Sequence, residues 1–145
     1  MAERDYRAIA NRVVEAWNRH DARAVAQLYT EDATLWDPTL PQPLRGRKAL
    51  EEFTQTMMRA FPDLRGESAN VFGSGDHIAI EFVMRGTHEG PLAGPQGEIP
   101  PTGRRVEMRA CQISRLTADG LFQDDRTYYD TAGMMQQLGL MPKPG

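Results

Sequence analysis

The amino-acid sequence predicts an α+β fold in which three N-terminal helices pack on an antiparallel sheet. Up to residue 62, apolar residues recur at intervals of three and four, the period of an amphipathic helix. From residue 68 the pattern changes to the alternation of β-strands, broken by turn signals. Helices that are segregated from a meandering sheet indicate α+β architecture. With no internal repeat or linker, residues 1–145 are expected to form one domain.

The three predicted helices each have one apolar face. The first should end near residue 20, and its face consists of Tyr6, Ile9, Val13, Val14 and Trp17. Asp21 can cap a short second helix, whose buried side consists of Ala22, Val25, Leu28 and Tyr29. The third helix spans residues 46–61 and ends at Pro62; its face consists of Leu50, Phe53, Met57 and Phe61.

The predicted strands begin with residues 31–37, which Pro38 stops. Two extended runs within residues 68–86 surround "GSGD", a strong hairpin signal. The proline- and glycine-rich segment 87–103 is expected to be a loop without regular structure, and loops of that length are usually functional or disordered. Residues 104–116 form the next strand, and 121–130 pair back on it after a turn. A short helix from residue 131 closes the chain.

Composition excludes several classes of protein. The net charge of −3 gives no electrostatic case for binding nucleic acid or an anionic membrane. The single cysteine, Cys111, excludes an internal disulfide and fits a reducing compartment. No segment approaches the ~20 apolar residues of a membrane span, and the N-terminus lacks the apolar run of a signal peptide. We therefore expect a soluble, cytoplasmic protein.

The last predicted strand, "LFQDDRTYYD" at residues 121–130, is unusual because neither of its sides is apolar. A strand packed on a core should have one apolar side. One interpretation is that Arg126, Tyr128 and Asp130 face a pocket between the helices and a strongly curved sheet. The other is that this is an edge strand whose charges are solvated and oppose aggregation. The periodicity favours neither.

Several segments together resemble a known family. They are "WNRHDARAVAQLYTEDATLWDP", "GRKALEEF", "GTHEGPLAG", "IPPTGRRVEMRACQISRL" and "DGLFQDDRTYYDTAGMMQQLGL". From about Ala8 to Pro142 the chain resembles the SnoaL-like polyketide cyclases, which belong to the wider ketosteroid-isomerase-like fold. The resemblance implies helices on a curved sheet that forms a cone with an internal pocket. The insert before "PPTG" is longer than in the family, and the last strand carries more charge.

The resemblance also implies a function. Such an enzyme closes a ring in a polyketide by intramolecular aldol condensation, without metal or cofactor, and works as a homodimer on a hydrophobic small molecule. One aspartate on the last strand is the acid–base group, and the position seven residues before "QLGL" is Asp130. His88, in "GTH", matches a histidine that the family commonly has near the cavity.

The aldol chemistry assigns expected roles to further residues. Asp130 would remove a proton from a carbon between carbonyls, because a desolvated carboxylate is a stronger base. His88, Tyr128 or Gln112 would stabilise the enolate, and Arg126 would orient Asp130 or offset negative charge on the substrate. The apolar shell of the pocket would consist of Trp17, Leu35, Trp36, Phe53, Met57, Phe61 and Met84.

Each candidate also has a structural interpretation. Asp130 is a favoured N-cap for the helix that begins at Thr131, and Arg126 can pair with Asp124 or Asp125 on the surface. His88 can bond only to backbone groups, and Trp17 and Trp36 can be core residues. No HExxH, CxxC, phosphate-binding or GxSxG motif occurs, so neither a metal site nor a nucleophilic mechanism is expected.

Two other functions remain open on the same fold. In epoxide hydrolases of this fold an Asp–Arg–Asp arrangement activates water, and Asp124, Arg126 and Asp130 share one predicted face of the last strand. Those enzymes, however, spread their aspartates over two strands. The other alternative is a non-catalytic domain that binds a small molecule or dimerises. A hydroxylase-like role, found in some relatives, is a further possibility among enzymes.

Overall fold

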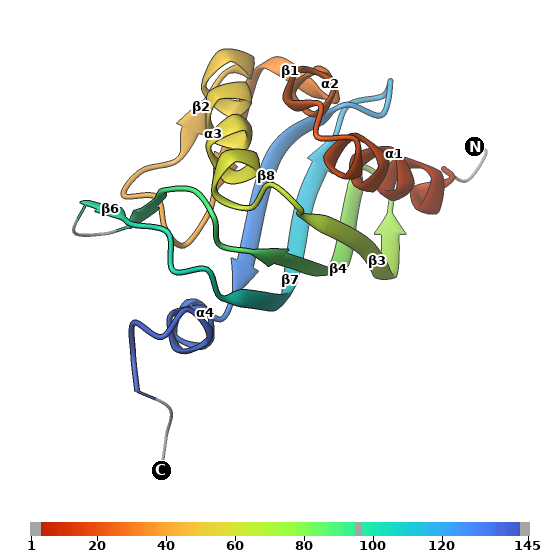
Figure 1. Cartoon of the computed structure of the whole chain (residues 1–145). Coiled ribbons are helices and arrows are strands. Elements are labelled where there is room, and N and C mark those ends of the chain that lie inside the picture. Colours follow the sequence, from red (N-terminus) through yellow and green to blue (C-terminus); the bar gives the residue numbers. More distant parts are fainter. Residues whose placement is uncertain (1–3, 95–96, 143–145) are drawn as a thin grey trace.

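A computed structural model gives the fold of residues 4–94 and 97–142, and it confirms the α+β architecture (Figure 1). The helices are α1 (Tyr6–Asn18), α2 (Ala22–Gln27), α3 (Arg47–Ala60) and α4 (Thr131–Gln137). The strands are β1 (Tyr29–Trp36), β2 (Leu44–Arg45), β3 (Arg65–Ser74), β4 (His77–Thr87), β5 (Leu92–Gly94), β6 (Gly97–Ile99), β7 (Arg105–Leu116) and β8 (Phe122–Tyr129).

The main sheet has six strands in the order β2-β1-β8-β7-β4-β3. Neighbouring strands are antiparallel except for β1 and β8, which run parallel. β8 therefore lies inside the sheet, between β1 and β7. The interpretation of residues 121–130 as an edge strand is wrong, because β2 and β3 are the edges. Pairing on both sides holds the backbone of β8 in place.

The helices α1, α2 and α3 cover one face of the curved sheet (Figure 1). Their buried side chains, among them Ile9, Val13 and Leu50, pack with Ile80 and Phe122 of the sheet to form the main core. Burying these aliphatic and aromatic side chains is the main stabilising contribution to such a layered fold. In the described part of the chain, no helix is both long and apolar enough to cross a membrane.

Tyr29 was predicted on the second helix, and this is wrong. The helix α2 ends at Gln27, with Leu28 as its C-cap, and Tyr29 is the first residue of β1. The ring of Tyr29 packs on Phe122 of β8, with ring centroids 5.3 Å apart. This tertiary contact between parallel strands overrides the local helical pattern. It also places the Tyr29 hydroxyl beside the candidate site.

The segment 87–103 was predicted to lack regular structure, and this is also wrong. It contains a two-stranded hairpin formed by β5 and β6. Leu92 of β5 is buried in a second apolar cluster with Leu64, Val106, Leu138 and others. The hairpin is therefore part of the packed structure.

The base of this segment is fastened to the rest of the fold. His88 N–H donates to Arg104 C=O at 2.9 Å, and Gly103 N–H donates to His88 C=O at 2.8 Å. Gly90 lies so close to the end of α3 that a Cβ atom there would be 2.1 Å from the carbonyl oxygen of Arg59. Only glycine fits such an approach of two backbones.

Candidate functional site

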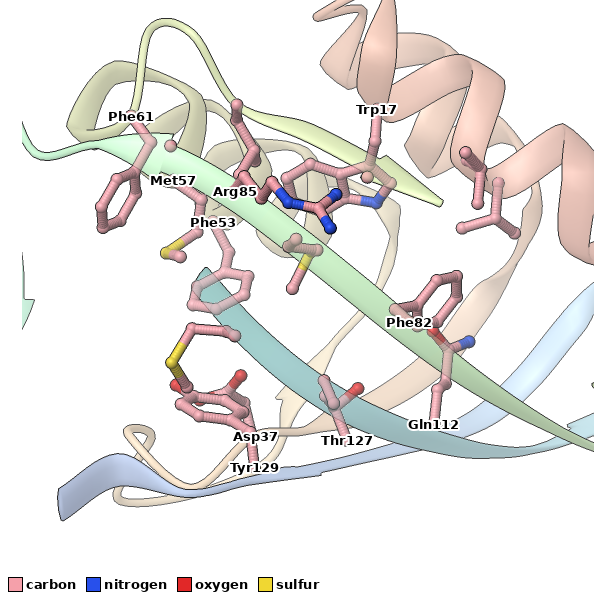
Figure 2. Close-up of a pocket in the computed structure, with 18 of the residues that line it drawn as sticks. Trp17, Asp37, Phe53, Met57, Phe61, Phe82, Arg85, Gln112, Thr127 and Tyr129 are labelled. Carbon is pink, nitrogen blue, oxygen red and sulfur yellow. The ribbon is translucent and has the colours of Figure 1, made fainter. Parts of the chain in front are cut away.

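A hollow with a volume of about 140 Å³ lies between the helices and the curved sheet (Figure 2). Most of its wall is apolar and comes from α1, α3, β4 and β7. Aromatic and methionine side chains that line it include Trp17, Phe53, Met57, Phe61, Phe82, Met84 and Met108. Such a wall suits a flat or ring-shaped apolar ligand.

Six of the predicted site residues line this hollow, namely Trp17, Phe53, Met57, Phe61, Met84 and Gln112. Four of them come from helical faces predicted by their spacing, with Phe61 at the C-cap of α3, and Met84 and Gln112 lie on β4 and β7. Their role in substrate binding stays a prediction. Leu35, also expected in the apolar shell, lines the hollow too.

Trp36 and Tyr128 do not line the hollow. Their rings pack against each other, with centroids 5.1 Å apart, on adjacent strands β1 and β8. Tyr128 is exposed and pairs with the exposed Cys111 across β7 and β8. The expectation that both rings contact a substrate in the hollow is therefore wrong, because they lie on the outer face of the sheet.

A β-bulge in β8 explains this orientation. Phe122 pairs with Leu116, but Asp124 pairs with Arg115, so Gln123 is an extra residue without a partner. Such an insertion exchanges the faces to which the following side chains point. Phe122 faces the core, and beyond the bulge the inward residues are Asp125, Thr127 and Tyr129. The predicted inward set of Arg126, Tyr128 and Asp130 faces outward.

Asp130 accordingly lies outside the hollow. It is exposed and is the N-cap of α4, where its carboxylate accepts a hydrogen bond from Gly133 N–H at 2.8 Å. This is the structural interpretation left open for Asp130. Because the carboxylate is solvated, it lacks the desolvation that the proposed chemistry requires.

Arg126 is also exposed on the outer face. Its Nε lies 3.6 Å from the carboxylate of Asp124, which in turn accepts a hydrogen bond from Thr34 at 2.8 Å. The predicted Asp124–Arg126–Asp130 set is thus a surface group, and exposed pairs of this kind contribute little to stability. None of its three members lines the hollow.

His88 is fully buried but does not line the hollow. Its Nδ1 accepts a hydrogen bond from Thr102 N–H at 3.2 Å and lies 3.0 Å from the Thr102 hydroxyl. Burial lowers the pKa of His88, which favours the neutral ring. In the described part of the chain its Nε2 has no hydrogen-bond partner. His88 therefore fastens the base of the 89–103 segment, and the predicted place near the substrate is not found.

Asp125 is the buried acid of the hollow. It is 1 % exposed, and it accepts hydrogen bonds from the hydroxyls of Tyr29 and, at 3.2 Å, Ser114. Gln112 donates to the Ser114 hydroxyl at 3.0 Å and completes this polar chain. Desolvation raises the pKa of Asp125 to about 7, although the two hydroxyl donors act in the opposite direction. Burial and the neighbouring Asp125 likewise raise the pKa of Tyr29, so its hydroxyl remains a donor.

Asp37 is a second carboxylate in the wall, and it lies beside Tyr129 (Figure 2). It directly follows β1 and is 8 % exposed. It accepts a hydrogen bond from the Tyr129 hydroxyl at 3.1 Å and two from Thr39. Burial and then the nearby Asp37 raise the pKa of Tyr129.

Sequence reasoning missed Asp125, Asp37, Tyr29 and Tyr129. For Asp125 a signal was present, because the predicted strand 104–116 alternates and places Gln112 and Ser114 on one face. The residues that pair with them are Thr127 and Asp125. Asp37 was harder to predict as a site residue, because its position before Pro38 indicates only the end of a strand.

Arg85 is the one cationic side chain in the wall among the described residues. Its guanidinium pairs with the exposed carboxylates of Glu107 at 3.3 Å and Glu67 at 3.4 Å. In residues 4–94 and 97–142, no group of three or more His, Cys, Asp or Glu side chains is placed to hold a metal ion. The arrangement suits acid–base chemistry by Asp125 in an apolar setting.

Comparison with known proteins gives a family and a fold. The family model described as SnoaL-like polyketide cyclase matches residues 7–138. No curated protein sequence matches the chain. Among solved structures, IdmH from Streptomyces antibioticus, a candidate polyketide cyclase, is 28% identical with a TM-score of 0.74, over 94% of this chain and 99% of that one.

Two further structures share the fold at lower identity. AclR from Streptomyces galilaeus, a candidate hydroxylase, is 22% identical with a TM-score of 0.80, over 97% of this chain and 85% of that one. A protein of ketosteroid-isomerase-like fold from Catenulispora acidiphila is 19% identical with a TM-score of 0.76, over 94% of this chain and 97% of that one. These similarities confirm the predicted fold. They do not identify the reaction, which has to be argued from the residues of the site.

Proposed function

Because this chain belongs to the SnoaL-like polyketide cyclase family, we propose that it is an enzyme that closes a ring in a polyketide by an intramolecular aldol-type reaction. The observation that carries the proposal is the carboxyl of Asp125, which is buried in the wall of an apolar hollow and has a pKa of about 7. A group with this pKa can take up and return a proton near neutral pH. The proposed reaction uses neither a metal ion nor a cofactor.

Asp125 would act twice in the reaction. As a carboxylate it removes a proton from a carbon between carbonyl groups, and the electron pair of the C–H bond moves onto a carbonyl oxygen as an enolate. The enolate carbon then forms a C–C bond to a second carbonyl carbon of the same molecule. The resulting alkoxide takes the proton back from the Asp125 carboxylic acid. The residue ends as a carboxylate, ready for another cycle.

The neighbours of Asp125 support this role. A carboxylate has about four lone-pair positions, so the bonds from Tyr29 and Ser114 leave acceptor capacity for a substrate proton. Gln112 uses one amide N–H for Ser114, and its second N–H is available to an enolate oxygen. Of the enolate donors predicted from the sequence, Gln112 alone lines the hollow. The substrate would be a hydrophobic, ring-forming molecule of polyketide type.

The proposal can be tested by proton exchange at carbon, which needs no knowledge of the natural substrate. In D₂O near pH 7 the protein should speed deuterium uptake at the α-carbons of 2-tetralone, measured by NMR. Asp125→Asn keeps the shape of the side chain and removes the base. Loss of a general base typically lowers a rate roughly 10²- to 10⁴-fold.

Asp124→Asn is the matched control, because it removes a carboxylate from the adjacent position on the outer face. It should keep the exchange rate of the wild type. Asp130→Asn should also keep it, because an asparagine can still cap α4. An equal rate in Asp125→Asn and wild type would disprove the assignment of the base.

An epoxide hydrolase is the second candidate, and it is favoured by one observation. The hollow contains two carboxylates from different parts of the sheet, Asp37 after β1 and Asp125 on β8. The arginine that would complete an Asp–Arg–Asp set is engaged elsewhere, since Arg85 pairs with Glu67 and Glu107. Transfer of oxygen-18 from labelled water into a diol would support this function over ring closure.

The expected homodimer also stays a prediction. The exposed apolar side chains of Ile113 and Tyr128 lie on the outer sides of β7 and β8, where a second copy could cover them. Light scattering during size-exclusion chromatography would give the mass in solution. A mass of one chain of 16.3 kDa at micromolar concentration would contradict the prediction.

A further inference from the structure

One oxygen of the Asp37 carboxylate holds all the hydrogen bonds that the side chain receives. Oδ1 accepts from Thr39 N–H at 2.9 Å, the Thr39 hydroxyl at 2.7 Å and the Tyr129 hydroxyl at 3.1 Å. Within residues 4–94 and 97–142 each hydrogen bond to the Asp37 side chain ends on Oδ1, and none ends on Oδ2. Asp37 is 8 % exposed and lines the hollow. Oδ2 is therefore an acceptor without a hydrogen bond from the described residues, on a side chain in the wall of the hollow.

The charge around Asp37 is unbalanced. Asp37 and Asp125 are both in the wall, whereas the guanidinium of Arg85 is paired with the exposed Glu67 and Glu107. The hydrogen bonds to Asp37 come from neutral groups, so its negative charge has no cationic partner among the described residues. A ligand that brings a positive charge to Oδ2 would form a charge-assisted hydrogen bond there.

The apolar wall suits such a ligand as well. The rings of Trp17, Phe53, Phe61 and Phe82 line the same hollow. Aromatic faces attract cations through their quadrupole, and the attraction grows when the cation is desolvated. The hollow thus combines an anionic acceptor with cation-compatible walls.

We propose that the hollow binds a protonated amine carried on an apolar, ring-sized body, with Asp37 Oδ2 accepting a hydrogen bond from the ammonium group. The inference deepens the proposed function and rests on it in one respect, since it takes the same hollow to be the ligand site. Asp37 is then a positioning residue that sets the orientation of the ring system relative to Asp125. It assigns a substrate class: amine-bearing ring compounds.

Four naphthalene probes of one size test the proposal. They carry an aminomethyl group, a hydroxymethyl group, a methyl group or a carboxylate at position 2, and their dissociation constants are measured at pH 7 by titration calorimetry. A charge-assisted hydrogen bond should make the amine bind roughly 10- to 100-fold more tightly than the methyl compound. The alcohol should fall between them, and the carboxylate should bind most weakly.

Asp37→Asn removes the acceptor while keeping the structure around it. The amide oxygen can replace Oδ1 and accept the same three bonds from Thr39 and Tyr129, and the NH₂ group replaces Oδ2. This variant should bind the amine no more tightly than the methyl compound. Asp124→Asn removes the same charge from the outer face and should keep the preference for the amine.

Several results would overturn the proposal. Equal affinity for amine and alcohol would show that the charge plays no part, and a preference retained in Asp37→Asn would place the amine elsewhere. Failure of all four probes to bind at millimolar concentration would show that the hollow does not accept a ring of this size. These binding measurements do not depend on turnover. Absence of an amine preference would therefore not contradict Asp125 as the base. Absence of catalysed exchange would not contradict binding of an amine by Asp37.

Discussion

Asp124 and Asp125 are neighbours in the sequence with the same side chain, but they lie on opposite faces of β8. Asp124 is partly exposed, accepts a hydrogen bond from Thr34 and lies 3.6 Å from the Nε of Arg126. Asp125 is 1 % exposed, and among the described residues its donors are the hydroxyls of Tyr29 and Ser114. The outer carboxylate is partly exposed and pairs with an arginine, whereas the inner one is buried and forms no salt bridge with a described residue. Environment alone therefore gives one aspartate a surface role and the other a pKa suited to acid–base catalysis.

The largest difference between the two aspartates should appear in how stability depends on pH. Burial raises the folded-state pKa of Asp125 to about 7, above the ordinary value of 3.8. The folded state therefore binds a proton more tightly than the unfolded state does, and this stabilises the folded protein. The stabilisation is fully present below pH 4. As the pH rises to about 7 it is lost, which lowers the free energy of unfolding by on the order of 4 kcal/mol.

Urea unfolding at pH 5 and pH 8 measures the part of this effect that lies above pH 5, roughly 3 kcal/mol. Asp125→Asn should lose the decrease between the two pH values, and at pH 8 it should be more stable than the wild type. Asp124→Asn should keep the decrease. A wild-type slope in Asp125→Asn would mean that Asp125 is not the group that titrates.

Tyr29→Phe should have a smaller effect, on the pKa of Asp125. The Tyr29 hydroxyl donates to Asp125 and lowers its pKa, so removing the hydroxyl should raise the pKa above about 7. Because catalysis needs the carboxylate, the midpoint of the rising limb of the pH–rate profile should move upward by about one unit at most. Deuterium exchange of 2-tetralone between pH 5 and pH 9 gives the midpoint, and a downward shift would contradict the assigned bond.

Asp130→Ala should have the smallest effect, and it should lower the stability of the protein without changing the exchange rate. The Asp130 carboxylate caps α4 through Gly133 N–H, and loss of an N-cap typically costs about 1 kcal/mol. Thermal unfolding should detect this loss, whereas Asp130→Asn should show little of it. A large fall in the exchange rate of either variant would mean that Asp130 takes part in the reaction. It would contradict the assignment of catalysis to the inner face of β8.

The sequence was sufficient for the fold and for much of the apolar wall. Helical spacing identified Trp17, Phe53, Met57 and Phe61, because a side chain on the buried face of a helix repeats every three or four residues wherever the partner lies. Gln112 was predicted as a possible enolate donor, and the alternation of buried and exposed residues along β7 buries it in the wall. These predictions depend on local periodicity, which the sequence displays directly.

The acid of the site could not be located in the same way. The family resemblance pointed to an aspartate on the last strand, and Asp125 is on that strand, but the chosen residue was Asp130. The extra residue Gln123 reverses the alternation, and it is defined by the pairing of β8 with β7 and with β1, which is distant in sequence. The short hairpin β5–β6 was missed because its strands of three residues are stabilised by packing of Leu92 and not by a local pattern.

The joined ends of the 89–103 segment have a consequence for protein engineering. Backbone bonds between His88 and Arg104 and between Gly103 and His88 close the segment, and the ring of His88 is held by Thr102. Residues between these ends can be lengthened, shortened or transplanted from relatives without altering the pairing of β4 with β7. A replacement needs glycine at position 90 and a buried apolar side chain at position 92. We therefore expect changes in the length of the segment to leave the hollow unaltered, because none of its described residues lines the wall.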